Sequence, residues 1–130
     1  MIVDSSAIVA VVFQEPDYAK VAHALDRSEV AAIGAPTVTE TGIVLGHRLG
    51  FRRLGLLHRF LQEFDISIVP FEEAHWTEAV AAYEAFGRGR HPAALNFGDC
   101  LSYAFAKVAG RPLLCVGNDF AKTDLELVPV

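Results

Sequence analysis

The 130-residue sequence lacks the features that mark membrane and secreted proteins. Its longest apolar run, residues 7–13, falls far short of the ~18 residues that a membrane-spanning helix needs. The N-terminus has no basic start, and Asp4 interrupts its apolar residues, so a signal peptide is not expected. These absences predict a cytoplasmic protein that does not associate with a membrane.

Cysteine and patterned histidine are also scarce. The two cysteines, Cys100 and Cys115, lie in apolar stretches without C-x-x-C spacing, and we expect them to be buried free thiols. The five histidines show neither an H-E-x-x-H motif nor any other paired spacing. The sequence therefore gives no support for a zinc site.

Positive charge is in short supply too. Eleven Lys and Arg stand against sixteen Asp and Glu, which gives a net charge of -5 and a pI of about 5.4. This balance argues against a protein whose entire surface binds nucleic acid, but it leaves room for a local basic strip. Apolar side chains, in contrast, make up 52% of the chain with a mean hydropathy of +0.32, so a substantial core can be buried.

Segments with strand and helix character alternate along the chain. Short apolar runs are separated by longer segments of helical periodicity, and Gly50 and Gly110 stand where helices are expected to end. The alternation predicts one α/β domain, residues 1–130, with a mostly parallel sheet of four to five strands flanked by helices. The expected strands are residues 2–5, 31–35, 66–69 and 113–116, with 125–128 as a fifth strand at the edge. Residues 6–13 are expected to form a helix or a turn, and the other expected helices are residues 16–28, 37–49, 52–64, 73–86 and a last one from 96 or 97 to 109.

Large apolar side chains recur at helical spacing in two of the predicted helices. We expect them to face the core. The apolar content is nevertheless generous for this length, so part of it is expected to form surface for a second copy or for another protein. The side chains expected to point inward are Leu57, Leu61 and Phe64 in one helix and Trp76, Val80 and Tyr83 in the other.

Four acidic residues are expected to meet at one edge of the sheet. Asp4 lies at the end of the first strand, and Asp119 follows the fourth. Glu40 and Asp99 lie in the first turns of the helices that follow the second strand and precede the fourth. In right-handed β-α-β units the amino ends of helices share an edge with the carboxyl ends of strands, and open α/β sheets bind ligands there.

Each acid also has a purely local interpretation. These are a helix cap for Asp4, capping boxes for Thr37 with Glu40 and for Asn96 with Asp99, and a turn for Asp119. Taken together, however, carboxylates within ~4–6 Å of one another repel unless one is protonated or a cation neutralises them. Oxygen ligands without His or Cys suit Mg²⁺ or Mn²⁺, which activate water and hold phosphate oxygens in phosphodiester cleavage.

The same segments resemble the motifs of PIN-domain proteins, and specifically the VapC-type toxins of bacterial toxin–antitoxin pairs. The opening MIVDSSAIVA resembles the first motif, and Glu40 within TVTET matches the second. LNFGDCLSYA (residues 95–104) and PLLCVGNDF (residues 112–120) resemble the third and fourth. The resemblance covers the whole chain in length and order, and it is the combination of four motifs that is specific.

The resemblance implies a Mg²⁺-dependent endoribonuclease that is usually dimeric and is held inactive by a cognate antitoxin. Asp4, Glu40 and Asp99 would be metal ligands and catalytic residues. Asp119 would be the fourth acid, with Asp124 as the alternative. Because a carboxylate cluster can also bind a guanidinium, the antitoxin is expected to block the site with an Arg flanked by apolar residues.

Two further polar residues lie close to the acids in sequence. Ser6 matches a hydroxyl near the site in the resembling family, and it also fits a helix cap. Asn96 fits either a cap or a residue that holds Asp99 or the substrate. Both are candidates for contact with substrate or for support of the acids.

The best local basic feature is the loop with Arg88, Arg90 and His91, just before the Asp99 helix. It is expected near the acidic edge, where it could take RNA phosphates, or it is an ordinary solvated loop. Arg52 and Arg53 open a predicted helix and are interpreted as surface residues.

Three other functions compete with a ribonuclease. A phosphatase with an Asp nucleophile after the first strand would need a second Asp where Ser6 stands. A non-catalytic PIN-like binding module is disfavoured because all four acids are present. A DNA-directed metallonuclease of the same fold stays open, because metal chemistry on a phosphodiester is indifferent to the 2′-hydroxyl.

Overall fold

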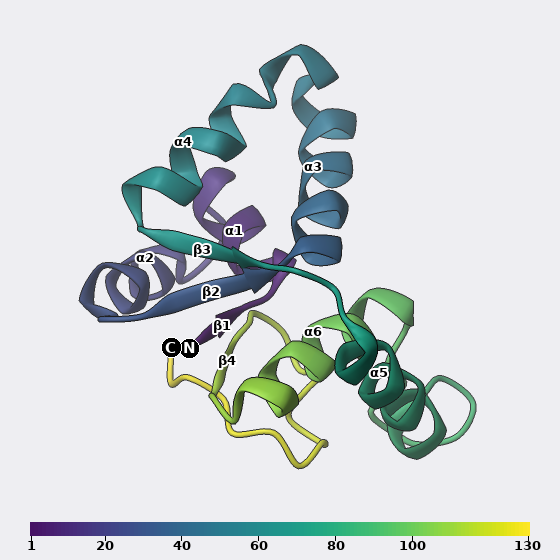
Figure 1. Ribbon diagram of the computed structural model, residues 1–130. Coiled ribbons are helices and arrows are strands. Elements are labelled where there is room, and N and C mark those ends of the chain that lie inside the picture. The colour runs from purple at the N-terminus through teal and green to yellow at the C-terminus, as the bar shows by residue number, and fades with distance from the viewer.

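A four-stranded sheet forms the centre of the molecule in a computed structural model that describes all residues, 1–130 (Figure 1). The strands are β1 (Ile2–Val3), β2 (Ala31–Gly34), β3 (Ile66–Val69) and β4 (Leu113–Leu114), in the order β3-β2-β1-β4. All neighbours are parallel, which confirms the predicted α/β sheet. The predicted fifth strand, residues 125–128, is reduced to a single bridge between Leu113 and Leu127.

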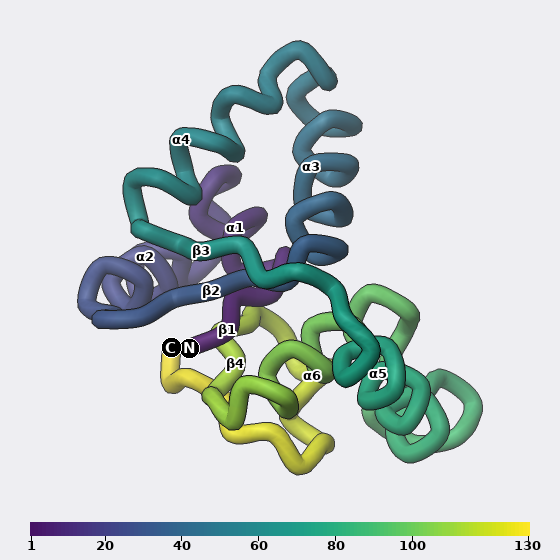
Figure 2. Tube along the Cα trace, in the orientation of Figure 1, coloured from purple at the N-terminus to yellow at the C-terminus, as the bar shows by residue number.

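Helices cover both faces of the sheet (Figure 2). Helices α5 (Glu73–Phe86) and α6 (Phe97–Ala109) pack on one face. The other face carries α1 (Ser5–Val12), α2 (Tyr18–Arg27), α3 (Ala35–Leu49) and α4 (Gly55–Glu63), with a short 3-10 helix η1 (Phe51–Arg53) between α3 and α4. None of these helices has the length and apolar character needed to cross a bilayer.

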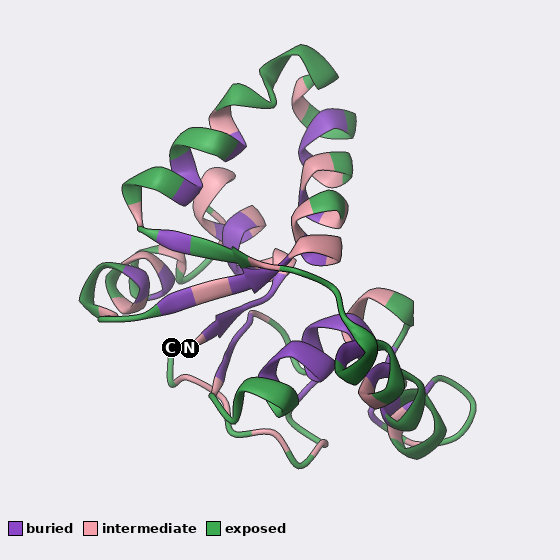
Figure 3. Cartoon of the chain, in the orientation of Figure 1, coloured by how far each residue is buried: buried purple, intermediate pink, exposed green.

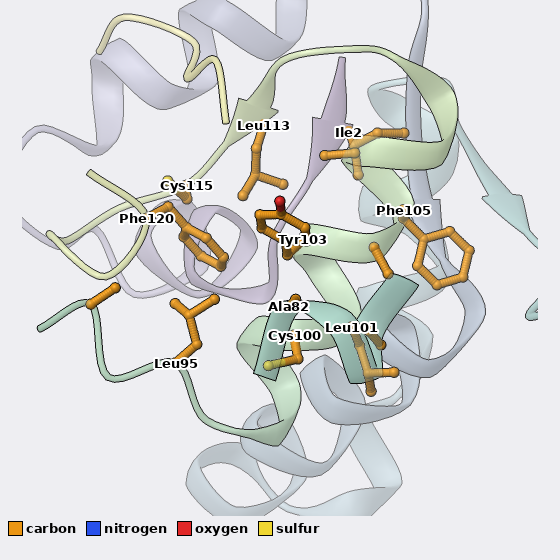
Figure 4. Packing of buried hydrophobic residues seen from close by; sticks show 14 residues of the cluster. Ile2, Ala82, Leu95, Cys100, Leu101, Tyr103, Phe105, Leu113, Cys115 and Phe120 are labelled. Carbon is orange, nitrogen blue, oxygen red and sulfur yellow. The ribbon is translucent and has the colours of Figure 1, made fainter. Parts of the chain in front are cut away.

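The pleat of the short strands divides the core into two clusters. Ile2 and Leu113 face α5 and α6, whereas the next residues, Val3 and Leu114, face the opposite helices. Figure 4 shows the buried residues of the first cluster, and Figure 3 shows that β1 and β4 are buried between the two layers. Strands that are covered on both faces can be apolar throughout, which is why β1 and β4 show no polar alternation.

The predicted start of α3 was two residues too late. The helix begins at Ala35 with Gly34 as its N-cap, and Pro36 stands in its first turn. A proline is well placed there, because the first turn has no partner for its missing N–H. Thr37 is consequently a buried residue inside the helix, so Glu40 forms no capping box with it and lies in the second turn.

The predicted orientation of α5 was also wrong. Trp76, Val80 and Tyr83 are 52%, 62% and 46% exposed, and α5 packs against α6 instead through a narrow face that includes Ala79 and Ala82. Small side chains allow the two helices to approach closely. The large apolar residues of α5 are therefore left on the surface.

Helices α3 and α4 form a hairpin that projects from the sheet (Figures 1 and 2). The predicted helix 52–64 is divided into η1 and α4, and Gly50 ends α3 with a positive φ of 93°. The ring of Phe51 occupies the space that a β-carbon of Gly46 would need. This contact folds η1 back onto the end of α3.

Candidate active site

The four acids share the carboxyl edge of the parallel sheet, as the sequence predicted. Asp4 follows β1 directly, and Glu40 lies in α3, which begins where β2 ends. Asp99 lies in the first turn of α6, and Asp119 follows β4. The parallel pairing of β1 with both β2 and β4 brings the ends of these segments together.

Asp4 is held by three donors on two helices. It is 5% exposed and serves as the N-cap of α1. Its Oδ2 accepts from the backbone N–H of Ser6 at 3.1 Å and from the Ser6 hydroxyl at 2.6 Å. Its Oδ1 accepts from the hydroxyl of Ser102 on α6. Sequence reasoning missed Ser102, although a lone serine among the apolar residues of α6 was a signal that could have revealed it.

Ser6 links Asp4 to the end of β4. Its hydroxyl donates to Asp4 and accepts a 3.0 Å hydrogen bond from the backbone N–H of Val116. The interpretation of Ser6 as a helix cap is wrong, because the N-cap of α1 is Asp4 and Ser6 lies inside the helix, where its hydroxyl holds the segment that leads to Asp119. The Ser6 hydroxyl contacts Asp4, whereas a role of Ser6 at a functional site stays a prediction.

Glu40 lies against the backbone at the start of α6. Its Oε2 occupies the position that a β-carbon of Gly98 would take, one residue before Asp99. Burial raises the pKa of Glu40, a hydrogen bond from Ser5 opposes this shift, and the charge of Asp4 adds to it. Gly98, which sequence reasoning also missed, is the position that makes room for this carboxylate.

Asp99 takes part in the capping box of α6, and its surroundings disfavour its charged form. Its Oδ2 accepts from the Asn96 N–H at 3.0 Å, while Asn96 Oδ1 accepts from the Asp99 N–H at 2.9 Å, so the predicted capping box is confirmed. Burial nevertheless raises the pKa of Asp99 to about 6, assisted by the negative charges of Asp119, Asp4 and Glu40. The four acids therefore lie close enough to affect one another's ionisation.

Asp119, not Asp124, belongs with the other acids. Asp124 accepts from the Tyr103 hydroxyl at 2.6 Å and pairs with Lys107 at 2.7 Å, which holds its pKa below the usual range. It is absent from the charges that raise the pKa of Asp99, whereas Asp119 is the first of them. Asp119 is exposed and hence the least constrained of the four.

The thiols near the acids are inert. Burial raises the pKa of Cys115 to about 12, with Asp4, Asp119 and Asp99 adding to the shift. Burial also raises the pKa of Cys100 to about 11, with help from Asp99. Both cysteines are free and buried, as predicted, and stay protonated at neutral pH.

No cationic side chain neutralises this edge. The only two ion pairs of the structure are Lys20 with Asp17 and Lys107 with Asp124. As the side chains stand, however, no group of three or more acidic, His or Cys residues is arranged closely enough to hold a metal ion. Uncompensated oxygen donors fit Mg²⁺ or Mn²⁺ in kind, but to ligate one ion these carboxylates would have to draw closer together.

The basic loop before α6 is partly engaged with its own surroundings. The Arg90 Nε donates to the Glu84 carbonyl at 3.1 Å, and the half-buried His91 ring accepts from the Ala93 N–H at 3.0 Å. Arg88 is exposed. A role of this loop in holding RNA stays a prediction.

Comparison with known proteins identifies the family. Residues 1–126 match the PIN domain. "Ribonuclease VapC36" of Mycobacterium tuberculosis is 46% identical over 127 residues, which cover 97% of this chain and 91% of that relative. "Ribonuclease VapC" of Mycolicibacterium smegmatis is 38% identical over 128 residues, which cover 98% of this chain and 99% of that relative.

Solved structures agree on the fold. The M. tuberculosis toxin VapC20, described as cleaving the sarcin-ricin loop, superposes with a TM-score of 0.78 at 15% identity, covering 99% of this chain and 98% of that one. A chain of a toxin–antitoxin complex from Klebsiella pneumoniae gives a TM-score of 0.71 at 17% identity, covering 99% and 97%. Since the match extends over nearly the entire chain, this protein belongs to the PIN-domain family and, within it, to the VapC proteins.

Proposed function

We propose that this protein is a metal-dependent endoribonuclease and the toxin of a type II toxin–antitoxin pair. The observation that carries the proposal is the edge of four mutually repelling carboxylates without a cationic partner. Relatives that are 46% and 38% identical over nearly their full lengths are named ribonucleases. Together these findings favour a phosphodiester-cleaving site over a binding module that has lost its chemistry.

Asp4, Glu40 and Asp99 are the residues that would hold Mg²⁺, with Mn²⁺ as a substitute, and Asp119 is the fourth acid. The bound ion would supply an activated water and a clamp for phosphate oxygens. Ser6 and Ser102 orient Asp4 through its two carboxylate oxygens. Asn96 holds Asp99 through the capping box. The hydrogen bonds to Asp4 and Asp99 therefore limit how these two carboxylates can rotate.

An apolar groove beside Glu40 supports a protein inhibitor as the partner. The groove has a volume of about 760 Å³, and its walls include Glu40 together with Ile43, Trp76, Val80 and Phe97. The side chain of Phe97 is 80% exposed, and the next residue is Gly98, against which Glu40 lies. An antitoxin segment with apolar side chains fits this groove, and an Arg on it would reach the acids beside Glu40. A homodimer that uses part of this surface stays a prediction.

The experiment that tests the function measures cleavage of a doubly labelled RNA by the purified protein. Excess EDTA should abolish cleavage, and Mg²⁺ or Mn²⁺ should restore it. Asp99→Asn serves as the matched variant, because it removes a charge and keeps the side-chain shape. Cleavage that persists undiminished in excess chelator would overturn the metal-dependent mechanism.

Two further substrates separate the competing functions. A DNA of the same sequence should be cut far more slowly than the RNA, and a small phosphate ester should not be hydrolysed. Preference for DNA would indicate a metallonuclease of a different specificity. Binding of a partner without cleavage of any nucleic acid would indicate the non-catalytic module.

A further inference from the structure

The positive charge of this acidic protein is concentrated in the projecting hairpin. Residues 41–62, which we call the α3–α4 arm, contain no Asp or Glu but carry Arg48, Arg52, Arg53 and Arg59. The arm therefore has a formal charge of +4, and the rest of the chain has -9. Such an asymmetry favours the binding of a polyanion, because a local excess of positive charge attracts one even when the net charge of the protein is negative.

The guanidinium groups of Arg52, Arg53 and Arg59 are available, and that of Arg48 lies against the Phe13 ring. Each of these arginines is exposed, and none takes part in either ion pair of the structure. Figure 3 shows that the outer end of the arm is mostly exposed. The charges of Arg52, Arg53 and Arg59 are thus not used to hold the fold together.

The arm presents these charges on a fixed frame. Phe51 packs on Gly46, and its ring also meets the ring of His47 edge-on with centroids 5.6 Å apart. The Arg48 guanidinium lies 3.5 Å above the Phe13 ring at the end of α1. These contacts tie the turn to α3, and α3 to α1, so the positions of Arg52 and Arg53 on η1 are defined.

A hollow opens between the end of α1 and the arm. It has a volume of about 500 Å³ and is lined by Arg52, Arg53 and Arg59 together with the Phe13 ring. Three arginines around a partly apolar floor match a phosphate with its neighbouring base or sugar. The hollow lies apart from the acids, because none of the four acids is among its lining residues.

The arm and the acidic edge are connected by one helix. Glu40 and Arg48 both lie on α3, eight residues apart, which is about 12 Å along the helix axis. A stacked strand with a rise of about 3.4 Å per nucleotide crosses that distance in three to four nucleotides. From this placement we propose that the α3–α4 arm binds the phosphate backbone of the substrate RNA a few nucleotides away from the bond that is cut.

This inference rests on the proposed function, which supplies the reason for an RNA at the acidic edge. Phosphate contacts of this kind position a nucleic acid and carry no sequence information. They also resolve a conflict within the site, because four carboxylates repel RNA, whereas the arm attracts it. An acidic protein is the other polyanion that could bind the arm, and the test separates the two.

Binding is measured by fluorescence anisotropy with a labelled 24-nucleotide single-stranded RNA in EDTA, so that no cleavage occurs. The triple variant Arg52→Gln, Arg53→Gln and Arg59→Gln should bind roughly tenfold more weakly at low salt. Its plot of log affinity against log salt should have a slope about 2 units shallower than the wild type, about 0.7 for each lost phosphate contact. The triple Lys variant at the same positions should keep most of the slope.

The matched control changes the same number of charges elsewhere. Lys20→Gln, Arg27→Gln and Arg111→Gln remove three exposed cations outside the arm and should leave the slope close to that of the wild type. Thermal melting of every variant checks that the fold is intact. Equal slopes for the arm variant, the control and the wild type would overturn the proposal, as would loss of antitoxin binding with unchanged RNA binding.

Cleavage assays separate this proposal from the proposed function. With Mg²⁺, the arm variant should lose more activity on the 24-nucleotide RNA than on a dinucleotide, which is too short to span both sites. If the wild type binds RNA through the arm but cuts nothing, the proposed ribonuclease activity is wrong and the proposed RNA contact of the arm is supported. The opposite result is that the wild type cuts RNA in Mg²⁺ and the arm variant has the same ratio of cleavage rates on the long and the short RNA. The proposed RNA contact of the arm is then wrong and the ribonuclease activity is supported.

Discussion

The carboxylate of Glu40 occupies the space that only a glycine at position 98 leaves open, because its Oε2 lies where a β-carbon of Gly98 would be. Gly98→Ala should therefore displace Glu40 while leaving α6 at least as stable, since alanine is the better helix former. We expect cleavage to fall by about 10²-fold, the usual result of a misplaced catalytic group. Steady-state cleavage and thermal melting check the two expectations.

Gly42→Ala is the control for this variant, because it makes the same change on the helix that carries Glu40. A β-carbon there would meet Leu54 and Leu57 at 3.7 Å, which is ordinary contact. It should stabilise the protein by about 0.5–1 kcal/mol. Full activity of Gly98→Ala would show that the position of Glu40 does not matter for catalysis.

The raised pKa of Asp99 makes the stability of the metal-free protein depend on pH. The folded-state value of about 6 exceeds the ordinary 3.8, so between these values the native state keeps a proton that the unfolded chain releases. The contribution of Asp99 to stability is fully present below pH 3.8 and is lost as the pH rises to about 6. Urea unfolding in EDTA across this range should show the decline, and Asp99→Asn should reduce it.

The same variant distinguishes a ligand from a cap. Asparagine can still accept the hydrogen bond from the Asn96 N–H, so Asp99→Asn at pH 7 should be as stable as the wild type or more stable, with cleavage abolished. Asn96→Ala removes the cap itself and should cost about 0.5–2 kcal/mol in free energy of unfolding. A destabilised but fully active Asp99→Asn would assign Asp99 to capping alone.

The fold could be predicted from the sequence because its signals are local. Short apolar runs and helix-ending glycines define β-α alternation, and the topology then assembles the acids at one edge. The orientation of α5 could not be predicted in this way, since periodicity shows an apolar face without telling core from exposed surface. Ala79 and Ala82 take the core because α6 approaches closely, and Trp76 is left outside.

The supporting contacts of the site were hidden for a different reason. Ser102 is 98 residues away from Asp4 in sequence. Gly98 makes room for the carboxylate of Glu40, which lies on another helix. Only the packing of α6 against β1 and α3 brings these groups together. The common edge of the acids was predictable, because Asp4 and Asp119 follow strands and Glu40 and Asp99 lie in the first two turns of helices.

The hydroxyl of Ser102 should contribute strongly to stability, because it donates to the carboxylate of Asp4, which is almost entirely buried. Ser102→Ala leaves Oδ1 of Asp4 without this donor and should cost about 1.5–3 kcal/mol in free energy of unfolding, as for a hydrogen bond to a charged group. Binding of Mn²⁺, followed by calorimetry, should weaken as well. Ser28→Ala removes a hydroxyl that only donates to the Val30 carbonyl, and it should change stability by less than about 0.5 kcal/mol.

The inhibitor and the metal ion should compete for the same carboxylates if the antitoxin blocks this edge. An Arg of the antitoxin would compensate the charge that Mg²⁺ otherwise neutralises, and its apolar neighbours would occupy the groove with Ile43 and Phe97. Raising the Mg²⁺ concentration should then weaken inhibition, and replacing that Arg by Ala should weaken the complex markedly. On the toxin side, Phe97→Asp should weaken the complex without lowering the melting temperature, since this side chain is 80% exposed. Inhibition that is indifferent to Mg²⁺, to every antitoxin Arg and to Phe97 would place the antitoxin elsewhere, for example over the loop with Arg88.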